Sequence, residues 1–208
     1  EKNIIERGFA EGWIKPQPPE IRTEKKVAVI GSGPAGLAAA QQLNRAGHTV
    51  TVFERDNAIG GLLRYGIPNF KLEKRIIDRR VAILEAEGIT FKTNVNVGVN
   101  YSVDQLSAFD SIVLCGGATE RRSLPTKGIE SKGVFQAMTF LTQQTKSLYG
   151  EVIPDQIRAT SKDVIVIGGG DTGSDCVGTS NRHGAKSVTN FEILPKPPVG
   201  RSETTPWP

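Results

Sequence analysis

The sequence predicts an α/β fold with two dinucleotide-binding units in tandem. An apolar strand candidate at Val27–Ile30 runs directly into a glycine-rich loop, and the same order returns at Val164–Ile167. Each loop is followed by a helix-forming segment and a further apolar strand, which together make a β-α-β unit. Because the two halves share one supersecondary plan, the pattern indicates a duplication rather than a short-period repeat array.

The composition is that of a folded protein without a membrane span. Of the 208 residues, 38% are hydrophobic and 23% are charged, which is enough to bury a core. No apolar run is long enough to cross a bilayer, and the charged start at Glu1–Ala10 lacks an export signal. The net charge is +4, but acidic and basic residues are interspersed and lack interleaved aromatics. We therefore expect a cytoplasmic protein with neither a nucleic-acid nor a membrane partner.

The two cysteines, Cys115 and Cys176, lie far apart in the sequence. They can form neither a C-x-x-C redox pair nor a metal cluster by themselves, so no metal site is expected. Both are interpreted as small buried hydrophobic residues, and a reducing compartment fits them.

Residues 1–25 are predicted to form an irregular N-terminal arm, because Lys15–Pro19 is too rich in proline for a helix. Residues 26–122 form the first predicted domain, in which Gly47 and Gly88 end the two helices. The elements expected here are strands at 27–30, 50–53, 89–99 and 111–114, and helices at 37–46 and 72–87. The third of these strands could also be one arm of a hairpin.

Residues 123–208 form the second predicted domain. A crossing segment with one helix around Gln136–Ser147 precedes the second glycine loop. A helix that ends at Gly184 and a strand at Ser187–Leu194 follow the loop. Both domains are expected to be incomplete on their C-terminal side, which would leave apolar surface of the second domain uncovered.

The first glycine loop, Gly31–Gly36, fits the pattern G-x-G-x-x-G between a strand and a helix. Its three glycines permit a tight turn, a close approach to a pyrophosphate and close packing of helix on strand, in that order. The helix that follows presents unpaired amides to the phosphates. Glu54 ends the next strand and can accept hydrogen bonds from ribose hydroxyls, and Gly60 with Gly61 offers a second close-approach loop. These features predict a nucleotide site, the alternative being a glycine-rich turn without a ligand.

The second glycine loop, Gly168–Gly173, repeats the pattern after an apolar strand and predicts a nicotinamide-dinucleotide site. An acid at the strand end favours the unphosphorylated ribose of NADH, whereas a nearby arginine favours the 2′-phosphate of NADPH. Glu192 falls one residue late compared with Glu54, so its side chain is expected to point elsewhere. Arg201 and Lys196 could bind the phosphate or be solvated loop charges. We favour NADPH over NADH.

The first fingerprint, Glu54 and Gly60-Gly61 together resemble the signature of flavoproteins with two dinucleotide domains, which hold FAD at this place. Cys115-Gly116-Gly117-Ala118 resembles the strand and glycine element that approaches the flavin in that superfamily. The resemblance implies two Rossmann-like units, one of the FAD type and one of the NAD(P) type. In such proteins the second unit binds NADH or NADPH and delivers hydride to the flavin.

Several longer strings resemble the small (beta) subunit of bacterial NADPH-dependent glutamate synthase, and dihydropyrimidine dehydrogenase shares the plan less closely. The strings are Gly12–Pro19, Gly61–Pro68 with Phe70–Leu72, Gly168–Gly184 and Phe191–Pro198. In that family NADPH reduces FAD, and electrons pass through iron–sulfur clusters to a large subunit that makes L-glutamate. The family's N-terminal cysteine clusters and its C-terminal glycine–aspartate strand are missing, so the chain resembles a central fragment without cluster ligands.

The resemblance carries the cofactor contacts over by position. For FAD they are Gly31, Gly33, Pro34, Ala35, Gly36, Glu54, Arg55, Gly61, Leu62, Arg64, Gly116 and Gly117. For NADPH they are Gly168, Gly170, Asp171, Thr172 and Arg201. Arg64 has the alternative of a surface cation, and His48 and His183 are interpreted as exposed residues at helix ends. No catalytic side chain is expected, because the cofactors supply the chemistry.

Three functions follow for comparison. The favoured one is an electron-input flavoprotein module that moves hydride from NADPH to FAD and onward to an iron–sulfur and large-subunit partner. A self-contained disulfide reductase of the thioredoxin-reductase kind would need a cysteine pair, and Cys176 stands alone. The third is a nucleotide-binding module without turnover.

Overall fold

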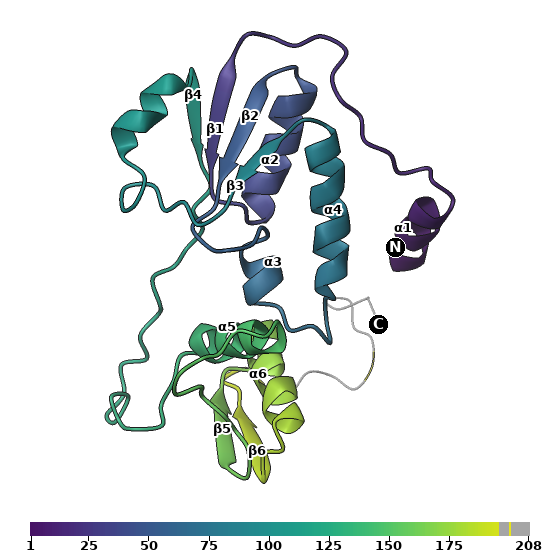
Figure 1. Cartoon of the computed structure of the whole chain (residues 1–208). Helices are drawn as coiled ribbons and strands as arrows, with labels where there is room; N and C mark the ends of the chain where they lie inside the picture. Colours follow the sequence, from purple (N-terminus) through teal and green to yellow (C-terminus); the bar gives the residue numbers. More distant parts are fainter. Residues whose placement is uncertain (196–199, 201–208) are drawn as a thin grey trace. The chain divides into compact units, whose positions relative to one another are not determined.

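A computed structural model describes residues 1–195 and residue 200. The chain divides into two compact units, Glu1–Ser131 and Lys132–Pro208 (Figure 1). Each unit has helices around a parallel sheet, so the α/β class is confirmed. The predicted domain boundaries after residues 25 and 122 stay predictions.

The first unit is built on a four-stranded sheet with the order β3-β2-β1-β4. All neighbouring strands are parallel, and Ile30 at the end of β1 pairs with both Phe53 and Leu114. The carboxyl ends of the central strands therefore meet at one edge, where doubly wound sheets bind ligands. The strands are β1 (Lys26–Ile30), β2 (Thr49–Phe53), β3 (Thr90–Lys92) and β4 (Ser111–Leu114).

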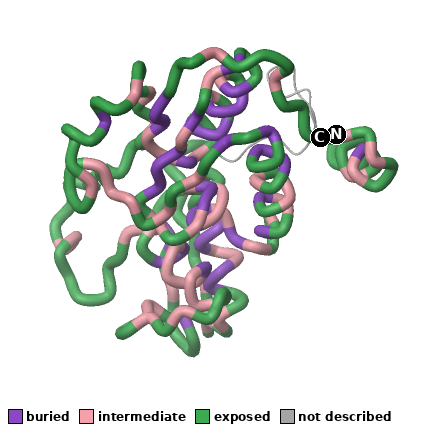
Figure 2. The backbone as a smooth tube through the Cα atoms, turned by 45° about the horizontal axis from the view of Figure 1, so that its top comes forward, coloured by how far each residue is buried: buried purple, intermediate pink, exposed green. Residues whose placement is uncertain are grey.

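Two helices of the first unit, α2 and α4, bury their apolar faces in the core beside this sheet (Figure 2). The core contains Val29, Leu37, Ala40, Val50, Val52, Ile59, Leu84 and Ile89. Gly47 ends α2 at a φ of +97°, and a Cβ there would meet the carbonyl oxygen of Ile21 at 2.6 Å. The helices are α1 (Lys2–Ala10), α2 (Pro34–Arg45), α3 (Leu62–Tyr65) and α4 (Lys74–Ala86), with a 3₁₀-helix at Val103–Ala108.

The prediction of an irregular arm is wrong for α1 and holds for residues 11–25, which contain no helix or strand. Arg79 of α4 explains the helix, because its guanidinium donates to both carboxylate oxygens of Glu6 at 3.0 and 2.8 Å. The same group lies 3.6 Å from the ring centre of Phe9. A contact between segments that are distant in sequence thus stabilises a helix that the local composition does not predict.

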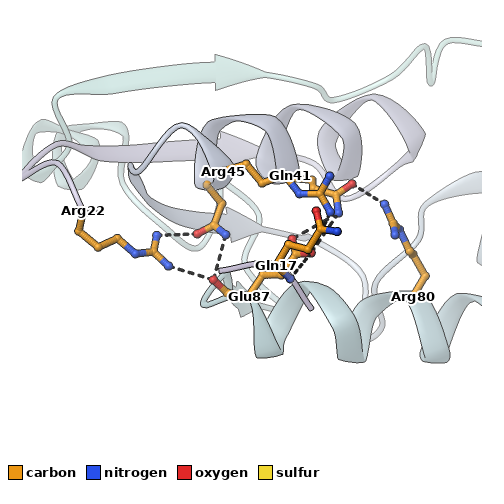
Figure 3. Close-up of polar contacts among 7 residues, drawn as sticks. Gln17, Arg22, Gln41, Arg45, Arg80 and Glu87 are labelled. Atoms are coloured by element: carbon orange, nitrogen blue, oxygen red, sulfur yellow. Dashed lines mark hydrogen bonds and ion pairs between the residues drawn. The ribbon is translucent and has the colours of Figure 1, made fainter. Parts of the chain in front are cut away.

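The rest of the arm is attached to the first unit around the carboxylate of Glu87 (Figure 3). The Gln17 amide donates to Glu87 at 3.1 Å, and Arg22 donates to the Glu87 carbonyl at 2.9 Å. Arg45 and Gln41 of α2 also donate to this carboxylate. One buried acid therefore joins the arm, α2 and the end of α4.

Two further predictions in the first unit need correction. The strand expected at 89–99 is limited to β3, which pairs with β2 in parallel, so the hairpin alternative is wrong. The chain turns after β3 because Asn94 and Gly98 adopt positive φ angles of 57° and 84°. The glycine-rich loop at residues 60–66 also contains the short helix α3.

The second unit repeats the β-α-β plan with a two-stranded parallel sheet. One face of this sheet packs on a core of Phe140, Leu141, Val166 and Cys176. On the other face Ile165, Ile167 and Phe191 remain 63%, 66% and 56% exposed, which is the uncovered apolar surface that was expected. The strand expected at 187–194 ends at Phe191. The elements are α5 (Ala137–Leu148), β5 (Asp163–Ile167), α6 (Asp171–Arg182) and β6 (Ser187–Phe191).

Candidate functional site: two glycine cradles

Two glycines of the first loop are required by close packing. Gly31 has a φ of +105°, and a Cβ at this position would lie 2.3 Å from the carbonyl oxygen of Cys115. A Cβ on Gly36 would lie 1.9 Å from the carbonyl oxygen of Gly31. No side chain fits at either place, so the tight turn and the close helix approach have their expected causes.

Gly33 differs from the other two glycines because its missing side chain leaves open space. No heavy atom lies within 4 Å of the Cβ position, and Gly33 is the N-cap of α2. The amides of Ala35 and Gly36 lie in the first helical turn, where backbone donors have no partner inside the helix. Pro34 lacks an amide and starts the helix at N1. The structure thus has a cradle of the kind that a diphosphate occupies.

Glu54 lies at the end of β2 and is only 4% exposed. Its Oε2 accepts the Ser32 amide at 3.0 Å and the Ser32 hydroxyl, and its Oε1 accepts the Asp56 amide at 2.9 Å. The Ser32 hydroxyl in turn accepts the Gly60 amide at 3.0 Å. The strand-end acid is therefore fixed beside both glycine loops. Ser32 was not among the predicted site residues, although its hydroxyl between two motif glycines was an available signal.

The remaining predicted FAD residues of the loop after β2 fall into two groups. A Cβ on Gly61 would lie 3.0 Å from the Cα of Gly33, so the second loop borders the cradle, and Leu62 beside it is exposed. The Arg64 Nε donates to the Ile59 carbonyl of its own loop, and its Nη2 pairs with Asp78 on α4. The predicted contact of Arg64 with FAD, like the others, stays a prediction.

Three other predicted residues border the same edge of the sheet. Arg55 directly follows Glu54, and its Nε lies 4.0 Å from Asp56. Gly116 and Gly117 follow β4, and no heavy atom lies within 4 Å of either Cβ position. Their bare backbone is thus placed next to the first cradle through Cys115, whose carbonyl contacts Gly31.

The second loop repeats two features of the first, the close packing of its third glycine and the open space at its second. A Cβ on Gly173 would lie 1.9 Å from the Gly168 carbonyl oxygen, which is the relationship of Gly36 to Gly31. Gly170 is the N-cap of α6, and no heavy atom lies within 4 Å of its Cβ position. Asp171 and Thr172 form the first turn of α6. Arg201, together with Lys196, lies outside the described residues.

The structure corrects the interpretation of Glu192. Phe191 pairs with Ile167 as Phe53 pairs with Ile30, so Glu192 follows β6 in the register in which Glu54 follows β2. The extra residue lies in the turn between Gly184 and Ser187 and does not shift the strand end. A Cβ on Gly169 would lie 1.9 Å from Glu192 Oε2, so the carboxylate covers the loop. The expectation that its side chain points elsewhere is wrong.

The Glu192 carboxylate is held by backbone amides. Its Oε1 accepts the amides of Leu194 at 3.1 Å and Ile193 at 2.7 Å. Hydrogen bonds from Leu194, Ile193 and Gly169 lower the pKa of this carboxyl against a smaller opposing effect of desolvation. Glu192 is therefore an anion at the end of β6 at neutral pH.

The contacts of the histidines and the burial of the cysteines are those of structural residues. The Nδ1 of His183 accepts the Ala159 amide at 3.3 Å, and its Nε2 lies 2.7 Å from Gln144 Oε1. His183 caps α6 as expected but is half-buried rather than exposed, and so is His48. Cys176 is buried as predicted, and burial raises its thiol pKa to about 11, whereas Cys115 is only partly buried.

The described residues contain neither a metal-binding cluster nor a membrane-spanning helix. No group of three or more His, Cys, Asp or Glu side chains in residues 1–195 is arranged to hold a metal ion. None of the helices described above has the length and apolar character that a membrane crossing requires.

Comparison with known proteins agrees with this geometry. The sequence model of the family described as pyridine nucleotide-disulphide oxidoreductase matches residues 25–204. Over its whole length the chain is 56% identical to the glutamate synthase [NADPH] small chain of Mycobacterium tuberculosis H37Rv and 54% to that of Bacillus subtilis. It is also 55% identical to the glutamate synthase [NADH] of Schizosaccharomyces pombe. The predicted resemblance to the glutamate synthase small subunit is confirmed.

The chain is shorter than these relatives. It spans 44% of the Mycobacterium protein, 43% of the Bacillus protein and 10% of the Schizosaccharomyces protein. Among solved structures, FprA of M. tuberculosis in complex with NADPH matches 81% of this chain and 43% of its own, with a TM-score of 0.66 and 23% identity. At that identity the match shows the fold alone.

Proposed function

Because the chain belongs to the pyridine nucleotide-disulphide oxidoreductase family, we propose that it is the FAD- and NADPH-binding part of an NADPH-dependent oxidoreductase. One observation carries the proposal. At the carboxyl edge of each unit's sheet, the helix begins at a glycine whose Cβ position is open, Gly33 in one unit and Gly170 in the other. Two such cradles suit two dinucleotides.

The first unit is the proposed FAD site, since within the described part of the chain it alone combines the glycine loop with a second loop, at Gly60-Gly61. Glu54, fixed by Ser32 and Asp56, would accept from the adenosine ribose, and the amides at the start of α2 would hold the diphosphate. Gly116 and Gly117 would allow a flat ring system to approach the backbone. FAD, when bound, would supply the two-electron chemistry.

The second unit is the proposed NADPH site. The amides of the first turn of α6 would hold the diphosphate beside Gly170, with Asp171 and Thr172 at the helix start. Arg201 is the proposed partner of the 2′-phosphate. The name of the Mycobacterium relative, a glutamate synthase [NADPH] small chain, supports this assignment.

The proposed physiological role is electron input to L-glutamate synthesis. The relatives named as glutamate synthase small chains support it, and that name implies a large-subunit partner. From the resemblance described above, we also propose iron–sulfur clusters held outside this chain. We place the reaction in the cytoplasm, because Cys115 and Cys176 are both free thiols.

A pair of crossed substitutions tests the proposal. Gly33 and Gly170 both have extended backbone with negative φ, so a valine at either position avoids backbone strain but fills a cradle. In titrations of the full chain, we expect Gly33→Val to abolish FAD binding and to leave NADPH binding unchanged. Gly170→Val should do the reverse. Anaerobic bleaching of the flavin band by NADPH should require both glycines.

Two outcomes would contradict the proposal. If the unsubstituted chain binds no FAD at micromolar concentration, a nucleotide-binding module without turnover describes it better. If it reduces disulfides instead, the chain is a disulfide reductase, which the buried Cys176 thiol with its raised pKa of about 11 argues against.

A further inference from the structure

The coenzyme preference is not decided by overall similarity. The chain is 56% identical to a relative named for NADPH and 55% identical to one named for NADH. NADH and NADPH differ only at the 2′ position of the adenosine ribose. In β-α-β dinucleotide units this position faces the residue that ends the second strand.

We propose that Glu192 occupies this position in the second unit and determines how strongly the chain discriminates against the 2′-phosphate. The inference rests on the second unit being a nicotinamide-dinucleotide site, as proposed above. A carboxylate here accepts hydrogen bonds from ribose hydroxyls and repels a phosphate dianion. Glu192 is thus a specificity-determining residue that opposes whatever cations bind the phosphate.

The position of Glu192 is fixed by the strand pairing. Phe191 pairs with Ile167, and the Gly168 amide donates to the Phe191 carbonyl at 2.8 Å, so the strand end and the glycine loop are joined. Asn190 strengthens this link, because its side-chain amide donates to the Gly168 carbonyl at 2.9 Å and the Val166 carbonyl at 3.0 Å. The backbone of Glu192 is therefore held next to the glycine loop.

A comparison of the two units shows that the glycine loop gives Glu192 no hydroxyl donor of the kind that Ser32 gives Glu54. In the first unit Ser32 lies between the first two motif glycines, and its hydroxyl donates to Glu54 Oε2. In the second unit the same place holds Gly169, which has no hydroxyl, and a Cβ at this position would lie 1.9 Å from Glu192 Oε2. The Glu192 Oε1 atom is engaged by the amides of Ile193 and Leu194, which orients the carboxylate and leaves Oε2 facing the loop.

The test compares two substitutions that remove one negative charge each. Glu192→Gln keeps the shape of the side chain. Asp163→Asn is the control, because Asp163 begins β5, at the opposite end of the sheet from the glycine loop, and pairs with Lys186 on the surface. Dissociation constants of the full chain are measured for NADH and NADPH, and for the fragments AMP and adenosine 2′,5′-bisphosphate, at one ionic strength.

We expect Glu192→Gln to shift the ratio of the NADH and NADPH constants about tenfold toward NADPH, the effect of removing a like charge near a phosphate in a partly solvated site. The fragment pair should shift in the same direction, and Asp163→Asn should leave both ratios unchanged. Equal shifts in the two variants, or no shift with Glu192→Gln while both coenzymes bind, would overturn the inference alone. Failure of the unsubstituted chain to bind either coenzyme would instead overturn the proposed function.

Discussion

The Oε1 atom of Glu87 lies 3.0 Å from the Nη2 atom of Arg45, and the Glu87 side chain is fully buried whereas that of Arg45 is 36% exposed. Glu87 is the C-cap of α4, and Arg45 is the last residue of α2. The same carboxylate accepts from Gln17 and Gln41 (Figure 3). A single acid thus holds together the N-terminal arm and the two helices that cover the first sheet.

We expect Glu87→Ala to lower the free energy of unfolding of the first unit by about 2 kcal/mol, because the backbone amide of Gln17 and the side-chain amide of Gln41 lose their acceptor, whereas the partly exposed Arg45 guanidinium stays solvated. Urea unfolding followed by circular dichroism measures this. Glu85→Gln is the control, since Glu85 lies exposed on the same helix. Equal effects of the two substitutions would show that the contacts of the Glu87 carboxylate make no specific contribution to the free energy of unfolding.

Substitution of the packing glycines should damage the fold rather than only the binding. Gly36→Ala places a Cβ 1.9 Å from the Gly31 carbonyl oxygen, so α2 must move away from the loop at a cost of about 3 kcal/mol. Gly33→Ala meets no atom within 4 Å and should leave stability nearly unchanged. Thermal unfolding of the two variants without ligands separates these outcomes. Loss of stability in both would mean that the cradle is a packed turn.

Much of the fold was predictable because its signals are local. Helix ends at Gly47, Gly88 and Gly184 coincide with positive φ angles that favour glycine, and the apolar strands need no distant information. The cradles at Gly33 and Gly170 follow from the same local pattern. Both β-α-β units were therefore identified correctly.

The errors arose where a contact between distant segments decides the structure. The helix α1 is held by Arg79, which lies far along the sequence. The pairing of Arg64 with Asp78 on α4 also depends on such a contact, which motif spacing does not show, while the predicted contact of Arg64 with FAD stays a prediction. The prediction for Glu192 was wrong because it counted residues from the glycines. The second unit has one extra residue before Ser187, and the strand pairing sets the strand end independently of it. Sequence spacing specifies neither the direction of a side chain nor the place in the fold where an extra residue is accommodated.

His183 should make the second unit less stable in mild acid. Burial lowers its pKa in the folded state below the ordinary value of 6.5, with a smaller contribution from Arg158. As the pH falls, the unfolded chain binds the proton first. The contribution of neutral His183 to the free energy of unfolding is therefore fully present above pH 6.5 and decreases as the pH drops toward the folded-state pKa. The urea midpoint of the second unit, measured between neutral and mildly acidic pH, should therefore decrease.

The substitution His183→Asn is the control for this pH dependence. It should flatten the dependence while lowering stability at neutral pH, because the Ala159 amide loses its acceptor and the edge contact with Phe140, at 5.3 Å between ring centres, is lost. An unchanged slope in the variant would assign the titration to another group.

Removal of the Arg79 guanidinium should release α1 without unfolding the sheet. Arg79→Ala deletes both hydrogen bonds to Glu6 and the stacking on Phe9 at 3.6 Å. Since the ion pair between Arg79 and Glu6 is partly solvated, the free energy of unfolding should change by less than about 1 kcal/mol. Hydrogen exchange of the amides in Lys2–Ala10, by contrast, should become fast, because a short helix does not persist without its tertiary contact. Arg75→Ala, which removes an exposed pair with Glu73, should leave that exchange slow, and fast exchange in both variants would show that Arg79 does not anchor the helix.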